Sequence, residues 1–374
     1  MNKENGIGTK GILIILAVAA GFCACFWLGR LSLQEEYRRE RELNITLARS
    51  DLQGLGEIKE TIYVTGHRNP DTDTVACAIA YADLLNKLGY DAVPVVQGPI
   101  SKETAWLLEQ AGVPIPEIMT DAAGKMMVLV DHSEVLHSAE GIQDARIISI
   151  IDHHGTGDIT ARDAMIYDAR PIGAAATIVW LRYRNYGVDY DKKIATLLLG
   201  AILSDTSNRK SDATTEADLE AIQSLSRFAG ITDPNGFYQE MTKAKYDYSG
   251  FSDEEIYLGD SKQYEGGSLK YSIGCVSAYD EEAAKDLCQR MKQIMPEIQK
   301  KTGMDMTIAQ ISIFHDDISI TYLVPGNEIA DEVIRTAYEK EAEFDGTAYI
   351  IEPGFSRKKL VAALNDVLES YPKE

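Results

Sequence analysis

The spacing of hydrophobic and polar residues divides most of this chain into alternating strand and helix segments. From residue 58 onward, short apolar runs alternate with longer runs whose apolar residues recur at helical spacing. Strands are expected at 61–65, 92–97, 126–130 and 147–151, and helices at 75–88, 101–111, 173–186, 191–203 and 214–229. This alternation is typical of a mostly parallel sheet flanked by helices, in which ligands bind at the carboxyl ends of the strands.

A polar stretch at 232–253 separates this pattern from a second one. Beyond it, strands are expected at 268–277, 306–314, 318–324 and 347–351, and helices at 280–300, 327–340 and 356–370. We therefore predict an α/β fold with two domains: a catalytic domain at 58–236 and a smaller α/β domain at 250–374, joined by a linker at 237–249. A cleft between the two domains would be the natural substrate site.

The N-terminal part of the chain has a different pattern. Residues 11–29 carry no charge, and at helical rise they would extend roughly 28 Å, close to the thickness of a hydrocarbon core. They predict a single transmembrane helix, followed by a charged helical spacer to residue 57. Arginines after the helix outnumber the two lysines before it, which places the catalytic domains in the cytoplasm. A cleaved signal peptide is the alternative.

Composition restricts the function classes. The 374 residues carry a formal net charge of -21, which argues against a nucleic-acid-binding surface. The five cysteines are odd in number and lack Cys-x-x-Cys spacing, so neither a disulfide framework nor a zinc knuckle is indicated. A Gly-x-Gly-x-x-Gly match at residues 6–11 follows no strand, so it does not indicate a dinucleotide site.

Acids and histidines follow four of the apolar runs. The first run leads into Gly-His-Arg-Asn-Pro-Asp-Thr-Asp-Thr at 66–74, where Pro70 predicts an extended Asn69 and an open turn. The others lead into Asp131-His132, Asp152-His153-His154 and Asp205. Any one of these residues alone would more often be a helix cap or a satisfied histidine. Four buried runs that all end in such groups favour a shared metal site, because an unpaired carboxylate there is costly.

The residue types indicate the metal. Mixed imidazole and carboxylate ligands suit Mn²⁺, Co²⁺ or Fe²⁺ better than Mg²⁺. One ion cannot use every candidate ligand and keep a position open for substrate, whereas two ions can. If Asp131 bridges two ions, they could share a hydroxide that is nucleophilic at neutral pH. The six candidate ligands are His67, Asp71, Asp73, Asp131, His153 and Asp205.

Five motifs in order resemble the manganese-dependent family II inorganic pyrophosphatases of the DHH phosphoesterase superfamily. The motifs are GHRNPDTDT (66–74), VDHSE (130–134), IIDHH (150–154), ILSDT (202–206) and SRKK (356–359). The resemblance spans about residues 60–374 and implies a DHH domain followed by a DHHA2 domain. It implies hydrolysis of diphosphate, two Mn²⁺ or Co²⁺ ions in each active site, a substrate-bound Mg²⁺, and a homodimer.

The resemblance also implies roles for single residues. His67 and Asp71 would hold one ion, Asp73, His153 and Asp205 the other, and Asp131 would bridge them. His154 would lie beside the bridging oxygen or the leaving phosphate and supply a proton. Three cations would bind the phosphates: Lys243, Arg357 and Lys358.

Two other functions remain open from the sequence. An exopolyphosphatase or another DHHA2-type phosphoesterase would use the same metal centre, although relatives of that kind often carry asparagine at the position of His67. A catalytically inactive membrane-tethered scaffold would use the helix at 31–57 as its interaction surface. Metal content separates the last reading from the others, because a scaffold needs no stoichiometric ion.

Overall fold

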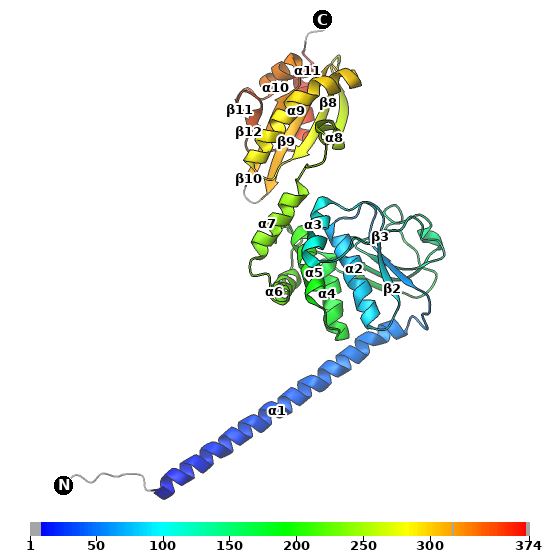
Figure 1. Ribbon diagram of the computed structural model, residues 1–374, viewed down its shortest axis with the longest axis vertical. Coiled ribbons are helices and arrows are strands. Elements are labelled where there is room, and N and C mark those ends of the chain that lie inside the picture. The colour runs from blue at the N-terminus through cyan, green and yellow to red at the C-terminus, as the bar shows by residue number, and fades with distance from the viewer. Residues whose placement is uncertain (1–8, 316–317, 372–374) are drawn as a thin grey trace, which may run out of the picture. The chain divides into compact units, whose positions relative to one another are not determined.

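A computed structural model describes residues 9–315 and 318–371, and this part of the chain forms two compact units, Met1–Tyr238 and Gln239–Glu374. Both units combine a sheet with helices, as the sequence pattern predicts (Figure 1).

The first unit contains a six-stranded parallel sheet in the order β3-β2-β1-β4-β5-β6. Its strands are β1 (Ile62–Thr65), β2 (Ala92–Val96), β3 (Glu117–Ile118), β4 (Met126–Val130), β5 (Arg146–Asp152) and β6 (Ile166–Ala169). From β1 the chain builds the sheet first toward β3 and then, through β4, toward β6. The strand order therefore reverses between β1 and β4, which is where such sheets bind ligands.

Helices supply the rest of the first unit. They are α1 (Thr9–Gln53), α2 (Thr72–Lys87), α3 (Lys102–Ala111), a 3₁₀ turn (Ile142–Asp144), α4 (Ala175–Tyr186), α5 (Lys192–Asp205), α6 (Glu216–Ala229) and α7 (Pro234–Lys245), whose end lies in the second unit. Helix α2 is apolar almost all round and buried over most of its length, because it packs against β1, α4 and α5 at once.

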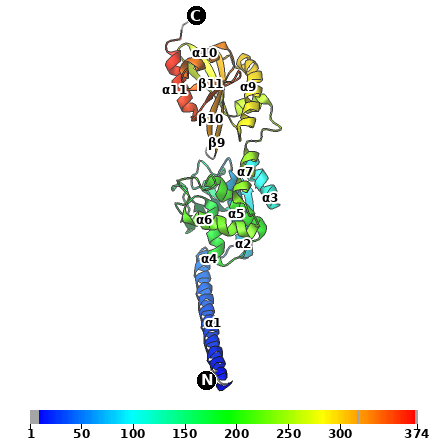
Figure 2. The same cartoon turned by 90° about the vertical axis from the view of Figure 1, so that its left-hand side faces the viewer.

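The second unit contains a mixed sheet in the order β11-β12-β10-β9-β8-β7, in which only β8 and β9 are parallel. Its elements are α8 (Asp253–Gly259), β7 (Ser261–Gly266), β8 (Leu269–Ser277), α9 (Glu281–Thr302), β9 (Met306–His315), β10 (Ile318–Pro325), α10 (Glu328–Ala337), β11 (Ala342–Phe344), β12 (Tyr349–Ile351) and α11 (Arg357–Leu368). One apolar cluster joins the sheet to α8 and α9, and another joins it to α10 and α11. Figure 2 shows α9 and α11 on opposite faces of this sheet.

Helix α1 corrects the prediction for the N-terminus. It runs without a break through 11–29 and the charged spacer, and it ends against α4. The side chains at 11–20, 24 and 25 lie outside the described residues. Where the structure does describe the chain, it contains no helix that is long and apolar enough to cross a bilayer. This finding corrects the predicted single-pass membrane location and gives no support to a membrane partner, whereas the predicted anchor at 11–29 lies partly outside the described residues.

The N-terminal part of the expected linker forms a helix. Residues 237–249 include the second half of α7, which the polar composition of the segment concealed. Phe237 on this helix packs against Trp106 of α3, with ring centroids 5.1 Å apart. The helix is therefore anchored to the first unit before it continues into the second.

Candidate metal centre

The centre is built at the carboxyl ends of β1, β4 and β5. His67 follows β1 by two residues, and its Nε2 lies 3.4 Å from Asp71 Oδ2 and 3.5 Å from Asp131 Oδ2. Between His67 and Asp71, Asn69 has a φ of 56°, so it is left-handed and not extended as predicted. Asparagine tolerates this conformation better than most residues, and the turn still brings Asp71 back toward His67.

Asp71 and Asp73 both cap helices, in addition to facing the centre. Asp71 is the N-cap of α2, where its Oδ1 accepts a hydrogen bond of 2.9 Å from Thr74 N. Asp73 is fully buried and reaches a different helix: its two oxygens accept from Ala175 N (2.7 Å) and Ala176 N (3.0 Å) at the start of α4. These bonds fix the carboxylates while leaving lone pairs free.

Asp131 lies between His67 on one side and His153 on the other. It follows β4 with a left-handed φ of 63° and is 1% exposed. Its Oδ2 accepts a bond of 2.8 Å from Thr74 Oγ1 and faces His67, while its Oδ1 lies 3.2 Å from His153 Nε2. One carboxylate thus turns one oxygen toward each side of the centre.

The end of β5 supplies both neighbouring histidines. The Nδ1 of His153 lies 3.0 Å from the carbonyl oxygen of Ile172, which orients Nε2 toward Asp131 and toward Asp205 Oδ2, at 3.2 Å. Asp205 is the last residue of α5. The His154 ring is half exposed, and its Nδ1 lies 3.7 Å from Asp131 Oδ1.

These side chains form three overlapping groups whose ligand atoms lie within 4.8 Å of one another. The groups are His67, Asp71 and Asp131; Asp73, Asp131, His153 and Asp205; and Asp131, His153 and His154. The first two match the two ligand sets that the family resemblance implies, and Asp131 belongs to both.

Two observations test whether these residues fit metal ions. First, Asp131 Oδ1 and His153 Nε2 are buried and, although they lie 3.2 Å apart, neither makes a well-directed hydrogen bond within the described residues. Such atoms are costly unless something binds them. Second, the carboxylates crowd together, so that burial and then the charges of Asp205 and Asp131 raise the pKa of Asp73. Divalent cations would satisfy the orphan atoms and relieve this repulsion, so the donor set fits them.

The pKa values of the two candidate histidine ligands are raised too, which for a histidine favours the charged form. Burial disfavours the charged ring of His153, but Asp131 and Asp205 outweigh burial and raise its pKa to about 12. The same balance, with Asp131 and Asp71 as partners, raises the pKa of His67 to about 11. Burial also opposes ionisation of Asp131, yet His153 and His67 lower its pKa. The two rings therefore hold protons at the positions that ions would take.

The three predicted phosphate-binding cations all lie in the second unit. Arg357 begins α11 and pairs with Asp260 at 2.8 Å. Lys358 is exposed. Lys243 on α7 is exposed, pairs with Glu240 at 2.6 Å, and lies 5.4 Å from the centroid of the Tyr279 ring. The structure thus separates the candidate metal ligands and the candidate phosphate ligands between the two units.

Sequence reasoning missed several polar residues that support the centre. Thr74 bonds Asp131, and Cys77 Sγ lies 3.3 Å from Asp73 Oδ1. Asp152, in the same motif as the two histidines, is fully buried and bonds His154 and Ser133. Thr74, Asp152 and Ser133 lie inside the recognised motifs, so the motifs themselves were the signal.

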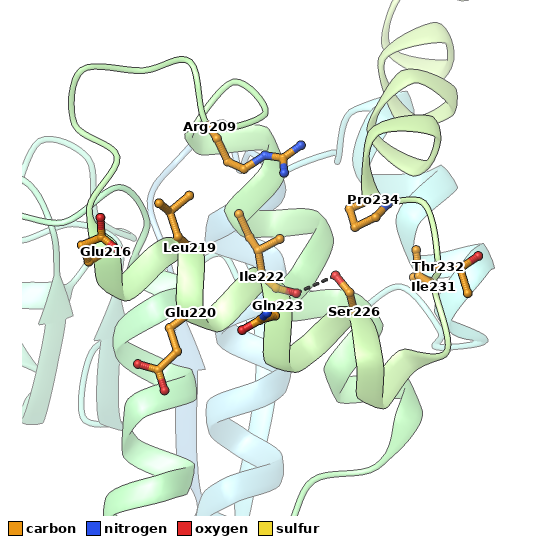
Figure 3. Close-up of a pocket in the computed structure, with 10 residues that line it drawn as sticks. All are labelled: Arg209, Glu216, Leu219, Glu220, Ile222, Gln223, Ser226, Ile231, Thr232 and Pro234. Carbon is orange, nitrogen blue, oxygen red and sulfur yellow. Dashed lines mark hydrogen bonds between the residues drawn. The ribbon is translucent and has the colours of Figure 1, made fainter.

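A pocket of about 680 Å³ lies elsewhere in the first unit, between α6 and the start of α7 (Figure 3). Its single guanidinium, Arg209, bonds Asn208 and Asn235, and two acids, Glu216 and Glu220, share the lining. None of the candidate metal ligands lines it. Its mixed charge does not suit a diphosphate.

Comparisons with known proteins agree with this geometry. Residues 61–202 match the model of the DHH family, N-terminal domain, and residues 239–367 match the DHHA2 domain. A manganese-dependent inorganic pyrophosphatase of Methanothrix thermoacetophila is 35% identical over 306 residues, which cover 81% of this chain and 96% of the relative. One of Bacillus subtilis is 32% identical, with 83% and 99% covered.

A solved structure is also similar to this chain. The crystal structure of a Methanococcus jannaschii protein assigned to the family II inorganic pyrophosphatases has a TM-score of 0.54 and 31% sequence identity to this chain. The match covers 83% of this chain and all of that one. Both the sequence relatives and this structure therefore match the chain over the two units together.

Proposed function

Because this chain belongs to the family of manganese-dependent inorganic pyrophosphatases with DHH and DHHA2 domains, we propose that it hydrolyses inorganic diphosphate to two phosphates. It is an enzyme of the metal-dependent phosphoanhydride hydrolase class, and its cofactor is manganese. The observation that supports this proposal most directly is the convergence of two ligand groups on the single carboxylate of Asp131.

We assign the residues as follows. His67, Asp71 and Asp131 would hold one ion, and Asp73, His153, Asp205 and Asp131 would hold the other. When bound, two such ions lower the pKa of an attacking water and neutralise charge on the phosphates. The shared hydroxide, the substrate-bound Mg²⁺, the interdomain location of the site and the homodimer stay predictions from the family resemblance.

The chain's own residues perform the remaining tasks. Asp131 is held rigidly by Thr74 and by its left-handed backbone, so the position common to both ion sites is fixed before substrate binds. His154 is half exposed beside Asp131 and presents a nitrogen to the leaving phosphate. Arg357, Lys358 and Lys243 would bind phosphate oxygens, because a guanidinium and ammonium groups match their charge.

Phosphate release by the purified chain tests the proposal. The chain should be assayed with Mn²⁺ on diphosphate, tripolyphosphate and long-chain polyphosphate, with bound manganese measured in parallel. We expect diphosphate to have the highest kcat/KM and manganese to co-purify or reconstitute at about two ions per chain. A preference for chains longer than two phosphates would support the exopolyphosphatase alternative. Absence of stoichiometric metal together with absence of hydrolysis would leave only the scaffold.

A further inference from the structure

The last residue of β5 is the buried carboxylate Asp152. It belongs to neither of the two predicted ligand sets. Its Oδ1 accepts a bond of 3.0 Å from the backbone N of His154 and lies 3.1 Å from the ring Nδ1 of the same residue. The backbone and the ring of His154 are thus both fastened to one oxygen.

The other oxygen of Asp152 is fastened as well. Ser133 Oγ donates to Asp152 Oδ2 at 2.9 Å, and Gly157 N in turn donates to Ser133 Oγ at 2.9 Å. Gly157 approaches so closely that a Cβ at this position would lie 2.1 Å from the carbonyl oxygen of Ser133. The segment after β5 is therefore clamped onto the segment after β4, with Asp152 between them. A carboxylate held at both oxygens has one orientation.

This arrangement decides which nitrogen of His154 is available. Ionised Asp152 can only accept, so the nitrogen that faces it must carry the hydrogen. Nδ1 is then committed to Asp152, and within the described residues Nε2 of His154 has no hydrogen bond. The ring is half exposed and stacks obliquely on His153, with ring centroids 4.2 Å apart. Nε2 is thus the nitrogen left for a ligand.

From these contacts, and resting on the proposed function, we propose that Asp152 is a positioning residue that commits Nδ1 of His154 and thereby presents Nε2 to the substrate phosphate. Asp152 itself touches neither substrate nor ion. Its effect on hydrolysis passes entirely through the His154 ring, in the way that a buried carboxylate orients a histidine in other hydrolases.

Two substitutions of His154 separate the ring nitrogens. The amide of Asn at position 154 reaches only as far as Nδ1, whereas the amide of Gln reaches the position of Nε2. We expect His154→Gln to retain at least about 10-fold more kcat than His154→Asn, because only Gln places a hydrogen-bonding group at the position of Nε2, where the substrate would lie. The His154 side chain is half exposed, so we expect both variants to fold. Equal kcat values in the two variants, or a higher value for Asn, would overturn the proposal.

A second experiment tests the connection to Asp152. Asp152→Asn should lower kcat about 10- to 100-fold in the wild-type background, with KM and bound Mn²⁺ little changed. In the His154→Gln background it should cause almost no further loss, because the contact that it disrupts is already gone. Equal losses in the two backgrounds, or loss of bound Mn²⁺, would show a merely structural role and overturn the proposal.

Asp158→Asn is the matched control. Asp158 lies in the same segment and accepts from the backbone N of Val135 at 2.8 Å, but it does not bond His154. It should leave kcat within about 2-fold of wild type. The proposed function has a separate readout, since it fails only if the wild-type chain with Mn²⁺ does not hydrolyse diphosphate. The positioning role fails if the wild type is active and the two His154 variants are equivalent.

Discussion

At the scale of single residues, Asp131 is the side chain around which the candidate metal ligands gather. It is the one residue common to all three groups of ligand atoms, and it is almost fully buried. Its left-handed backbone turns the side chain off the end of β4 and between the histidines. Aspartate and asparagine adopt this conformation more readily than other residues with a Cβ, so the position suits a carboxylate on backbone grounds as well.

Asp131→Asn isolates the charge of this residue. Asparagine keeps the size and tolerates the φ of 63°, but it offers one neutral oxygen in place of two charged ones. We expect kcat to fall by more than about 100-fold and bound Mn²⁺ to drop, because the loss of an outer partner at a metal site alone costs about 10- to 100-fold. Phosphate release and metal analysis measure both effects. Lys243→Ala, an exposed comparison, should cost less than 10-fold, and similar small losses in both variants would refute the shared position of Asp131.

Metal binding should depend on pH through the two histidines. Without metal, the pKa values of His67 and His153 are raised to about 11 and about 12, so both rings are charged at neutral pH. An ion must displace these protons, and therefore higher pH favours binding. We expect Mn²⁺ affinity to rise from pH 6 to pH 8. Calorimetric titration in two buffers of different ionisation enthalpy should give different apparent enthalpies, and identical enthalpies would contradict proton release.

At the scale of elements, the helix termini determine where the ligands sit. Ala174, the N-cap residue of α4, has no side-chain cap, and Asp73 from α2 supplies one instead. The same carboxylate therefore joins two helices and faces the centre. Burying it is acceptable because two backbone amides bond it and the N-terminus of α4 favours negative charge.

Periodicity predicted most of these elements but not their termini. The helix expected from residue 75 begins at Thr72, because Asp71 caps it. Helix capping was the alternative to metal binding for these acids, and Asp71, a candidate ligand, is also a helix cap. The short edge strands β3 and β6 were missed, since the two residues of β3 are both exposed and those of β6 are alternately exposed, which leaves too few buried apolar residues for a pattern. The polar segment expected to be a linker forms α7, whose contact between Phe237 and Trp106 cannot be read from local sequence.

The contact between α1 and α4 gives a prediction for two glycines. Gly187 and Gly112 end α4 and α3 with nearly equal φ values of 62° and 63°. A Cβ on Gly187 would lie 2.3 Å from Ile45 Cδ1 of α1, whereas a Cβ on Gly112 would meet nothing within 4 Å. Both alanine variants lose about 1 kcal/mol from the left-handed backbone, and Gly187→Ala should lose about 1 kcal/mol more from overpacking.

Thermal unfolding measures this difference. Gly187→Ala should have the lower Tm in the full chain, and the two variants should become equivalent when Ile45→Ala removes the contacting side chain. A Tm difference that persists with Ile45→Ala would show that α1 does not pack against Gly187. This result would leave the catalytic proposal untouched, because the candidate metal ligands all follow residue 66.

At the scale of the whole molecule, the two units contribute different chemistry. The first unit gathers carboxylates and imidazoles, which bind cations, and the second carries the arginine and lysines proposed for phosphate. The family match extends over both units, whereas α1 precedes the matched region that starts at residue 61. Motif order in the sequence predicted this division of residues. The predicted membrane location rested on the hydropathy of a single segment, with no motif to support it, and the helices of the described residues contradict it.

The division of chemistry predicts separable kinetic defects. Arg357→Ala should raise KM for diphosphate about 10- to 100-fold, which corresponds to the ~1.5–3 kcal/mol of a hydrogen bond between charged groups, while bound Mn²⁺ stays unchanged. Asp131→Asn should show the reverse, with metal lost. Since Arg357 pairs with the Asp260 carboxylate at 2.8 Å, Asp260→Asn is the control. It removes the charged partner, keeps the hydrogen bond from Arg357 Nη1 to the backbone carbonyl of Asp260, and should not raise KM. Loss of Mn²⁺ from Arg357→Ala would mean that the second unit helps to build the metal centre, and the proposed separation of roles would then be incorrect.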